Sequence, residues 1–224
     1  MTKLLDQLRT LALVLSLGAC GGASPQLEVP APAPVPARVA VAGTLNRFAA
    51  ERMMVLPLQE VVADDAMGWR AKAGPDSTVR QRVDSTLESL LTDRGVNQWV
   101  YPPALTRSAK RNPTYLINPH SIRASGAIRA ASRTPQQMIL EPLASQLRGL
   151  AGVSDARWAL VPLELRFVTD GATRSRAQLS LAVIDVRGSQ VRWSGDVMGD
   201  SHADYSFAAI VSAVQRAADL VVPR

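Results

Sequence analysis

SLAVIDVRGSQVRWSGDV, residues 180–197, decides the fold of this 224-residue chain. Apolar and polar side chains alternate along residues 176–186 and again along residues 191–198. An alternation of period two is typical of a strand that buries one face. The residues between the two runs, 187–190, include a glycine and polar side chains of the kind that turns use. Two alternating runs around such a turn predict an antiparallel β-hairpin.

A third alternating run, RWALVPLELRFVT at residues 157–169, precedes the hairpin. We expect five apolar side chains of this run to lie on one face of a strand: Ala159, Val161, Leu163, Leu165 and Phe167. Pro162 has no amide to donate to a ladder, so it predicts either a sheet edge or a β-bulge at this point.

After the hairpin, residues 203–222 change to the periodicity of a helix. Seven side chains share one helical face: Phe207, Ile210, Val211, Val214, Ala217, Ala218 and Val221. This spacing predicts a closing amphipathic helix that covers the sheet.

The first half of the chain predicts a strand, a helix and a second strand. The strand covers residues 53–58 and ends near Pro57. Asp76 or Ser77 can cap the helix, which stops before Gly95. Its apolar face is formed by five residues: Val79, Val83, Leu87, Leu90 and Leu91. The second strand then covers residues 96–101 and is ended by two prolines, Pro102 and Pro103.

The middle of the chain is less regular, with Asn-Pro pairs at Pro113 and Pro119 that favour turns. A short helix is expected over residues 104–111. A second helix can place Pro135 or Pro142 in its first turn and runs to Gly152, with Leu143, Leu147 and Leu150 on one side. Together these elements predict an α/β (α+β) fold over residues 42–224, a single mixed sheet with flanking helices. The predicted order is strand, helix, strand, short helix, helix, three strands and a closing helix.

The same middle region is the most basic part of the chain and gives the candidate partner-binding residues Arg107, Lys110, Arg111 and Arg123. Two interpretations stay open: a surface that binds an anion or a partner, and a solvated basic connection. Elsewhere the arginines are scattered without a dense cluster, which argues against a nucleic-acid-binding surface.

The N-terminus has the pattern of an export signal. Lys3 and Arg9 precede an apolar run that covers residues 10–19. A membrane-spanning helix needs about 20 apolar residues, so this run fits the core of a signal peptide. It ends at Cys20, the only cysteine of the chain, which therefore has no disulfide partner within it.

The residues Leu17-Gly18-Ala19-Cys20 resemble the lipobox of bacterial lipoproteins. The resemblance implies that residues 1–19 are a lipoprotein signal peptide and that cleavage falls between Ala19 and Cys20. Cys20 then becomes the first mature residue and carries a lipid anchor of the palmitate-bearing kind. The expected location is the bacterial cell envelope, on the outer membrane and facing the periplasm.

Residues 20–41 predict a linker between this anchor and the folded domain. Five prolines keep the backbone extended and remove amide donors: Pro25, Pro30, Pro32, Pro34 and Pro36. At about 3.1 Å per residue, residues 21–40 would span roughly 60 Å at full stretch. Loss of the signal peptide lowers the net charge from +6 to +5, because two basic residues and one acidic residue leave with it.

The domain itself is similar to a group of bacterial envelope proteins that comprises the TolB amino-terminal domain, CsgG and LpoB. Val55-Leu56-Pro57-Leu58 corresponds to the group's early strand, and residues 181–188 with Trp193-Ser194-Gly195 correspond to its late hairpin. The resemblance implies a binding or accessory module that docks on an envelope assembly or transport protein. A subunit of a CsgG-like oligomeric secretion channel is the alternative, so the oligomeric state stays open.

The sequence offers little catalytic chemistry. His120 and His202 lie in different segments, and the lone cysteine leaves no zinc-type ligand spacing, so we expect no metal and no cofactor. One stretch, Gly199-Asp200-Ser201-His202, looks like the serine block of the SGNH esterases. The alternative is a polar turn in which Asp200, Ser201 or Asp204 caps the closing helix. Because no Asp-x-x-His follows Ser201, we favour the turn and predict that the protein is not an enzyme.

Overall fold

Three long strands form the centre of the sheet in the computed structural model, which describes residues 40–62 and 67–224. They are β3 (Trp158–Thr169), β4 (Ser175–Asp185) and β5 (Gln190–Met198), paired antiparallel in that order. The predicted hairpin is therefore confirmed as β4 and β5. Its turn is tight: the Gly188 N–H donates to Asp185 Oδ1 at 3.3 Å, and Ser189 has a φ of 49°.

The predicted early strand is divided into two short segments, β1 (Met53–Val55) and β2 (Glu60–Val61), which both pair parallel to β3. Between them the backbone still follows β3, since the Leu56 N–H donates to Leu160 O at 2.9 Å and the Gln59 N–H donates to Pro162 O at 3.0 Å. The sheet is thus mixed, as predicted, with five strands.

A β-bulge lies in the middle of β3, where the register with β4 shifts between Pro162 and Glu164. The bulge that Pro162 predicted is confirmed, although β3 is paired on both sides and is not an edge strand. The extra residue reverses which side of the sheet the following side chains occupy.

This reversal corrects the prediction of one apolar face along β3. Ala159, Val161 and Leu163 belong to one buried cluster, whereas Leu165 and Phe167 belong to the cluster on the opposite face of the sheet. A strict alternation of faces along the strand does not allow for the bulged residue. The sequence therefore predicted all five apolar side chains on the same face of the sheet.

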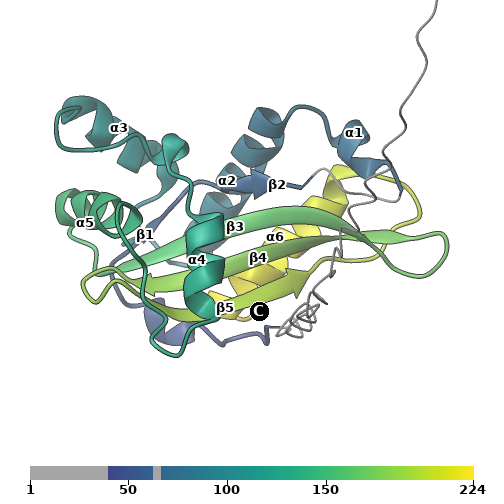
Figure 1. Cartoon of the computed structure of the whole chain (residues 1–224). Helices are drawn as coiled ribbons and strands as arrows, with labels where there is room; N and C mark the ends of the chain where they lie inside the picture. Colours follow the sequence, from purple (N-terminus) through teal and green to yellow (C-terminus); the bar gives the residue numbers. More distant parts are fainter. Residues whose placement is uncertain (1–39, 63–66) are drawn as a thin grey trace, which may run out of the picture. The chain divides into compact units, whose positions relative to one another are not determined.

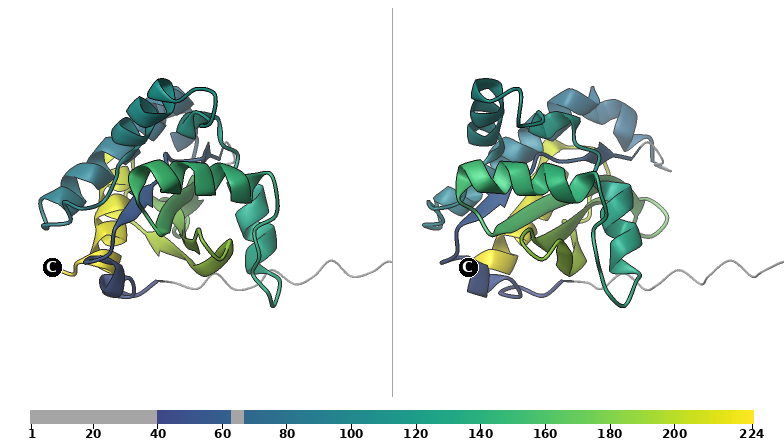
Figure 2. Two further views of the ribbon diagram at one scale, coloured as in Figure 1. Left: turned by 90° about the vertical axis from the view of Figure 1, so that its left-hand side faces the viewer. Right: turned by 60° about the vertical axis from the view of Figure 1, so that its left-hand side comes forward.

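Two layers of helices cover the two faces of the sheet (Figures 1 and 2). One layer consists of α2 (Asp76–Thr92) and α6 (Phe207–Val221), together with α1 (Trp69–Ala73) and the short helix η1 (Asn46–Phe48). The other consists of α3 (Pro102–Arg111), α4 (Ser125–Ser132) and α5 (Leu143–Ser154), with the short helix η2 (Pro119–Ser121) before α4. The predicted α/β (α+β) sheet with flanking helices is confirmed.

Several elements differ from the sequence predictions in their extent. The predicted strand over residues 96–101 is reduced to one parallel bridge between Met54 and Val100, and Pro102 begins α3 instead of ending a strand. Helix α4 was not predicted at all. The closing helix begins at Phe207, four residues later than expected, because residues 203–206 form bends and an extended N-cap.

The first turn of α2 also differs. Pro75 is its N-cap and Asp76 is its first residue, and no side chain caps the helix. The carboxylate of Asp76 is therefore available for other partners. At the other end, Gly95 adopts the positive φ of 86° expected after a helix.

No helix among residues 40–62 and 67–224 is long and apolar enough to cross a membrane. The predicted signal peptide, the lipidated Cys20 and most of the linker lie outside the described residues.

Candidate functional site

A polar cleft of about 480 Å³ opens where three separate segments meet. One wall is β2 with the residue before it, the second is the first two turns of α2, and the third is the start of α4 with the two residues before it. Four charged side chains line the cleft: Glu60, Asp76, Arg80 and Arg123. Because the cleft is lined by both positively and negatively charged side chains, it is the strongest candidate for a binding site in the described part of the chain.

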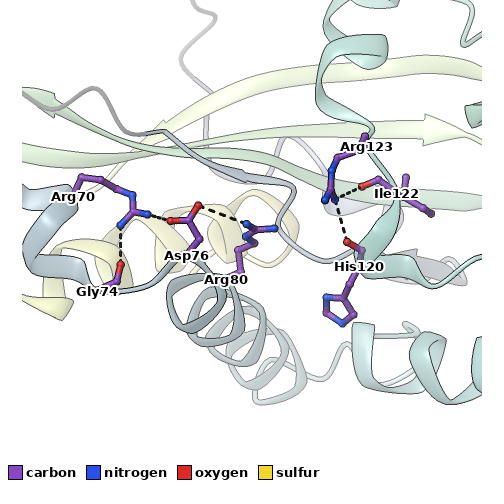
Figure 3. Close-up of polar contacts among 7 residues, drawn as sticks. All are labelled: Arg70, Gly74, Asp76, Arg80, His120, Ile122 and Arg123. Carbon is purple, nitrogen blue, oxygen red and sulfur yellow. Dashed lines mark hydrogen bonds and ion pairs between the residues drawn. The ribbon is translucent and has the colours of Figure 1, made fainter.

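Asp76 and Arg80 occupy the α2 wall (Figure 3). Asp76 Oδ1 forms an ion pair with Arg70, whose guanidinium also donates to Gly74 O at 2.7 Å. Asp76 Oδ2 lies 3.6 Å from an Arg80 terminal nitrogen, one helical turn away. Asp76 is thus paired more closely with Arg70 than with Arg80. The ion pair between Asp76 and Arg80 is the longer of the two.

Arg123 lies on the α4 wall and has a different environment. Its guanidinium donates to two backbone carbonyls of its own loop, His120 O at 3.2 Å and Ile122 O at 3.3 Å (Figure 3). No carboxylate pairs with it among residues 40–62 and 67–224. A guanidinium has five N–H donors, so these two bonds from one nitrogen leave donors free for a ligand.

The charge of Arg80 also acts on His120, in the loop that carries Arg123. Burial lowers the pKa of His120, and the positive charge of Arg80 lowers it further. A neutral imidazole is therefore favoured, because protonation would place a second positive charge near Arg80.

Gln59 connects the β2 wall to the α4 wall. Its buried amide donates to Pro57 O at 2.7 Å, and its Oε1 accepts from the Ala124 N–H at 3.0 Å. The next residue, Glu60, is exposed and lines the cleft. Gln59 thus fixes the start of α4, and Glu60 supplies a negative charge beside it.

Helix α4 is held on the sheet by polar contacts that follow from the bulge. The Ser125 hydroxyl donates to Leu163 O at 2.8 Å. One turn further along, Arg129 forms an ion pair with Glu164, whose side chain is 1% exposed and also pairs with Arg166. A buried carboxylate needs such partners to remain charged, so the pairing orients α4 at the cleft.

The carboxylate of Asp84 lies on α2 one turn beyond Arg80 and accepts the Leu58 N–H at 2.8 Å. Burial raises the pKa of Asp84 to about 7, although the Leu58 N–H and the charge of Arg80 both act to lower it. Asp84 therefore connects α2 to the backbone that precedes β2. Because its pKa is about 7, the carboxyl group gains or loses its charge near neutral pH.

The predicted basic residues do not form one site. Arg107, Lys110 and Arg111 are exposed on α3 and do not line the cleft, whereas Arg123 does. The other predicted site residues, Ala19 and Cys20, lie outside the described residues. Whether the exposed α3 residues bind anything stays a prediction.

Ser201 is held in a polar turn. Arg174 Nε donates to its Oγ at 3.0 Å, and the Ser201 hydroxyl is the largest influence that lowers the pKa of Asp170. The neighbouring His202 has a buried Nε2 without a hydrogen-bond partner in the described part of the chain. Asp200 binds Arg216 at 3.0 Å, and its N–H donates to Ser212 Oγ, so the segment connects β5 to α6.

Metal ligands are not gathered in the described ranges. Among residues 40–62 and 67–224, no three histidine, cysteine, aspartate or glutamate side chains form a group that could hold a metal ion.

The sequence predicted no binding role for four of the cleft residues: Gln59, Glu60, Asp76 and Arg80. In the sequence, Arg80 is one of several polar residues on the solvated face of a helix, and Glu60 follows a strand. Neither position indicates a binding residue. The only signal in the sequence was the basic character of the segment that contains Arg123.

Comparison with known proteins gives matches only among solved structures. No protein-family model matches the chain, and no curated protein matches it. The C-terminal domain of LpoB from Salmonella enterica is 14% identical, with a TM-score of 0.34, and covers 75% of this chain and 88% of its own.

Two further structures have comparable scores. Lipoprotein GNA1162 from Neisseria meningitidis is 11% identical, with a TM-score of 0.36, over 71% of this chain and 90% of its own. The PelC dodecamer from Paraburkholderia phytofirmans is 13% identical, with a TM-score of 0.34, over 83% of this chain and 93% of its own. The structural neighbours thus include LpoB and related lipoproteins. Scores of this size carry no argument about partner or activity, and the grouping with TolB and CsgG stays a prediction.

Proposed function

We propose that the chain is a lipid-anchored lipoprotein of the bacterial envelope that acts by binding a partner protein of envelope assembly or transport. It is anchored through Cys20 to the outer membrane and faces the periplasm. The observation that carries this proposal is the placement of the only cysteine directly after a short apolar run and small residues.

The linker supports an accessory role. Residues 21–40 are rich in proline and would let the domain reach roughly 60 Å from the membrane surface. A domain on such a tether can meet a partner at a distance from its own anchor. Tethering also raises the effective concentration of the domain at that partner, so a weak contact suffices.

The polar chemistry of the domain favours binding over catalysis. Ser201 is bound to Arg174 and Asp170, and its neighbour His202 is not in hydrogen-bond contact with it in the described part of the chain. A serine nucleophile needs a base within hydrogen-bond reach, and the Asp170 carboxylate that Ser201 contacts is a weak base because its contacts with Ser201 and Arg176 lower its pKa. The cleft, in contrast, presents guanidinium donors and carboxylates that suit recognition of a polar partner.

Cross-linking in cells tests the proposed function. An affinity-tagged full-length chain, expressed in a bacterial host and cross-linked before lysis, is expected to recover envelope proteins above the background of an untagged strain. The matched control is a tagged Cys20→Ser chain, which retains the domain and loses the anchor. We expect it to recover fewer membrane-associated proteins, since its local concentration at the membrane falls. Recovery of no envelope protein above background would contradict the proposal.

A further inference from the structure

The cleft contains a specific arrangement of unlike charges that points to the chemistry of its ligand. Arg80 and Arg123 come from opposite walls, and Figure 3 shows the Arg80 guanidinium between Asp76 and the loop that carries Arg123. Neither arginine has a close carboxylate partner of its own among the described residues, since Asp76 is 3.6 Å from Arg80 and is already paired with Arg70.

Arg80 carries an unsatisfied donor. Its Nε is buried and has no hydrogen-bond partner in the described part of the chain. Leaving a buried donor unpaired is costly, so a small shift of the guanidinium toward a charged acceptor in the cleft, which exposes this donor, would recover free energy. The Arg80 side chain is still 32% exposed, so an acceptor that enters from the cleft can reach the guanidinium.

The start of α4 adds donors to the same wall. The first N–H groups of a helix have no intrahelical partner, and here no side chain caps them. Ser125 and Gly126 line the cleft, and the Ala124 N–H before them is occupied by Gln59. The partial positive charge at this end of α4 therefore acts together with the two guanidinium groups.

Glu60 restricts which anion suits the cleft. It is exposed and lines the cleft, and it forms no ion pair with any residue in 40–62 and 67–224. It repels a doubly charged phosphate more strongly than a singly charged carboxylate, and it accepts hydrogen bonds from N–H donors. A ligand with one carboxylate and neighbouring amide N–H groups satisfies both sides of the cleft, and a peptide that contains an acidic side chain has this composition.

The geometry points to the cleft as the docking site for a carboxylate-bearing peptide segment of the partner protein, with Arg80 and Arg123 binding the carboxylate and Glu60 accepting peptide N–H groups. This inference rests on the proposed function, because it assumes that the partner is a protein. It adds the location and the chemical class of the contact.

Peptide titration of the detergent-solubilised full-length lipoprotein tests the inference, with the arginine Nε–H signals followed by NMR. The probe is the N-acetylated and C-amidated peptide Gly-Gly-Asp-Gly-Gly, and the matched probe replaces its aspartate by asparagine. We expect saturable shifts of the Arg80 and Arg123 signals with the aspartate peptide only. Inorganic phosphate should produce weaker shifts than the aspartate peptide.

Arg123→Gln is the main variant, since in the described part of the chain the hydrogen bonds of this exposed side chain go to carbonyls of its own loop. This substitution should lower the affinity for the aspartate peptide by about tenfold, the loss expected for one charge-assisted hydrogen bond. Arg187→Gln makes the same charge change at an exposed position in the turn between β4 and β5, which does not line the cleft, and should leave binding unchanged. Arg80→Gln provides a second loss of cleft charge, and thermal unfolding confirms that each variant is folded.

Three outcomes would overturn the inference: equal shifts with both peptides, equal affinities of R123Q and R187Q, and tighter binding of phosphate than of the aspartate peptide. Cross-linking separates this inference from the proposed function. If R123Q loses the peptide but recovers envelope partners as well as the unsubstituted chain does, the docking role of the cleft is contradicted and the envelope function stands. If the peptide binds as expected but no envelope protein is recovered, the proposed function is contradicted. The inference that the cleft binds a carboxylate-bearing peptide still stands.

Discussion

Replacing Gly199 by alanine is expected to lower the free energy of unfolding by about 2–4 kcal/mol. A Cβ at this position would lie 2.6 Å from Ser212 Oγ, 2.8 Å from Ala209 O and 2.9 Å from Ala213 N. These atoms belong to α6, and two of them are backbone atoms that can move only if the helix moves. The glycine therefore permits the close approach of α6 to the end of β5.

The substitution also threatens the polar contact that secures this approach. Ser212 Oγ donates to Ala209 O at 2.8 Å and accepts the Asp200 N–H at 2.8 Å. Displacing the hydroxyl would leave a buried donor or acceptor unpaired. For a domain of this size, we expect the midpoint of thermal unfolding to fall by roughly 5–15 °C.

Gly152→Ala is the matched control, because a Cβ at Gly152 in α5 meets nothing within 4 Å. Alanine in a helix interior should raise stability by about 0.5–1 kcal/mol. Urea unfolding of the two variants beside the unsubstituted chain measures both effects. A G199A chain as stable as the G152A chain would show that α6 does not pack against β5 in the way described.

The second large effect concerns pH. Asp84 has its ordinary pKa of 3.8 in the unfolded chain and about 7 in the folded one. The folded state thus binds the proton more tightly, so this contribution to stability is fully present below pH 4. It is lost as pH rises from about 4 to about 7, at up to roughly 1.4 kcal/mol per pH unit.

Asp84→Asn should remove this dependence. The amide cannot ionise, and its oxygen can still accept the Leu58 N–H that Asp84 Oδ1 accepts at 2.8 Å. We expect D84N to match the unsubstituted chain near pH 4 and to exceed its stability by roughly 2–4 kcal/mol at pH 8. Denaturant unfolding at several pH values provides the measurement.

Asp93→Asn is the control for this experiment. Asp93 is exposed at the C-cap of α2, so the same chemical change there should leave the pH profile unchanged. Parallel stability profiles of D84N and the unsubstituted chain between pH 4 and pH 8 would contradict the assignment of this titration to Asp84.

The sequence predicted the parts of the fold in which side-chain periodicity is long and regular. Strands β3, β4 and β5 alternate over 12, 11 and 9 residues, and the apolar faces of α2 and α6 repeat over several turns. Gly95 correctly predicted the end of α2, because glycine readily adopts the positive φ found there. Pro162 correctly predicted a bulge as one of two alternatives, because proline has no amide N–H to donate to the sheet.

Periodicity failed where tertiary contacts decide the structure. Ala124 gives α4 no side-chain cap, and α4 has only 8 residues, so its start is set by Gln59 and Leu163 from the sheet. The reversal of faces along β3 depends on one bulged residue. The cleft was not predictable, since Glu60, Arg80 and Arg123 belong to segments that only the folded chain brings together.

Intact-mass and peptide mass spectrometry of the chain purified from bacterial membranes tests whether the protein is anchored through Cys20. We expect a mature protein whose first residue is Cys20, with residues 1–19 removed and the mass of a lipid on the cysteine. A Cys20→Ser chain should lack this lipid and leave the membrane fraction. A mature protein with an unmodified Cys20 thiol, or a C20S chain that is still processed and found with membranes, would contradict the claim that this lipoprotein is anchored through Cys20.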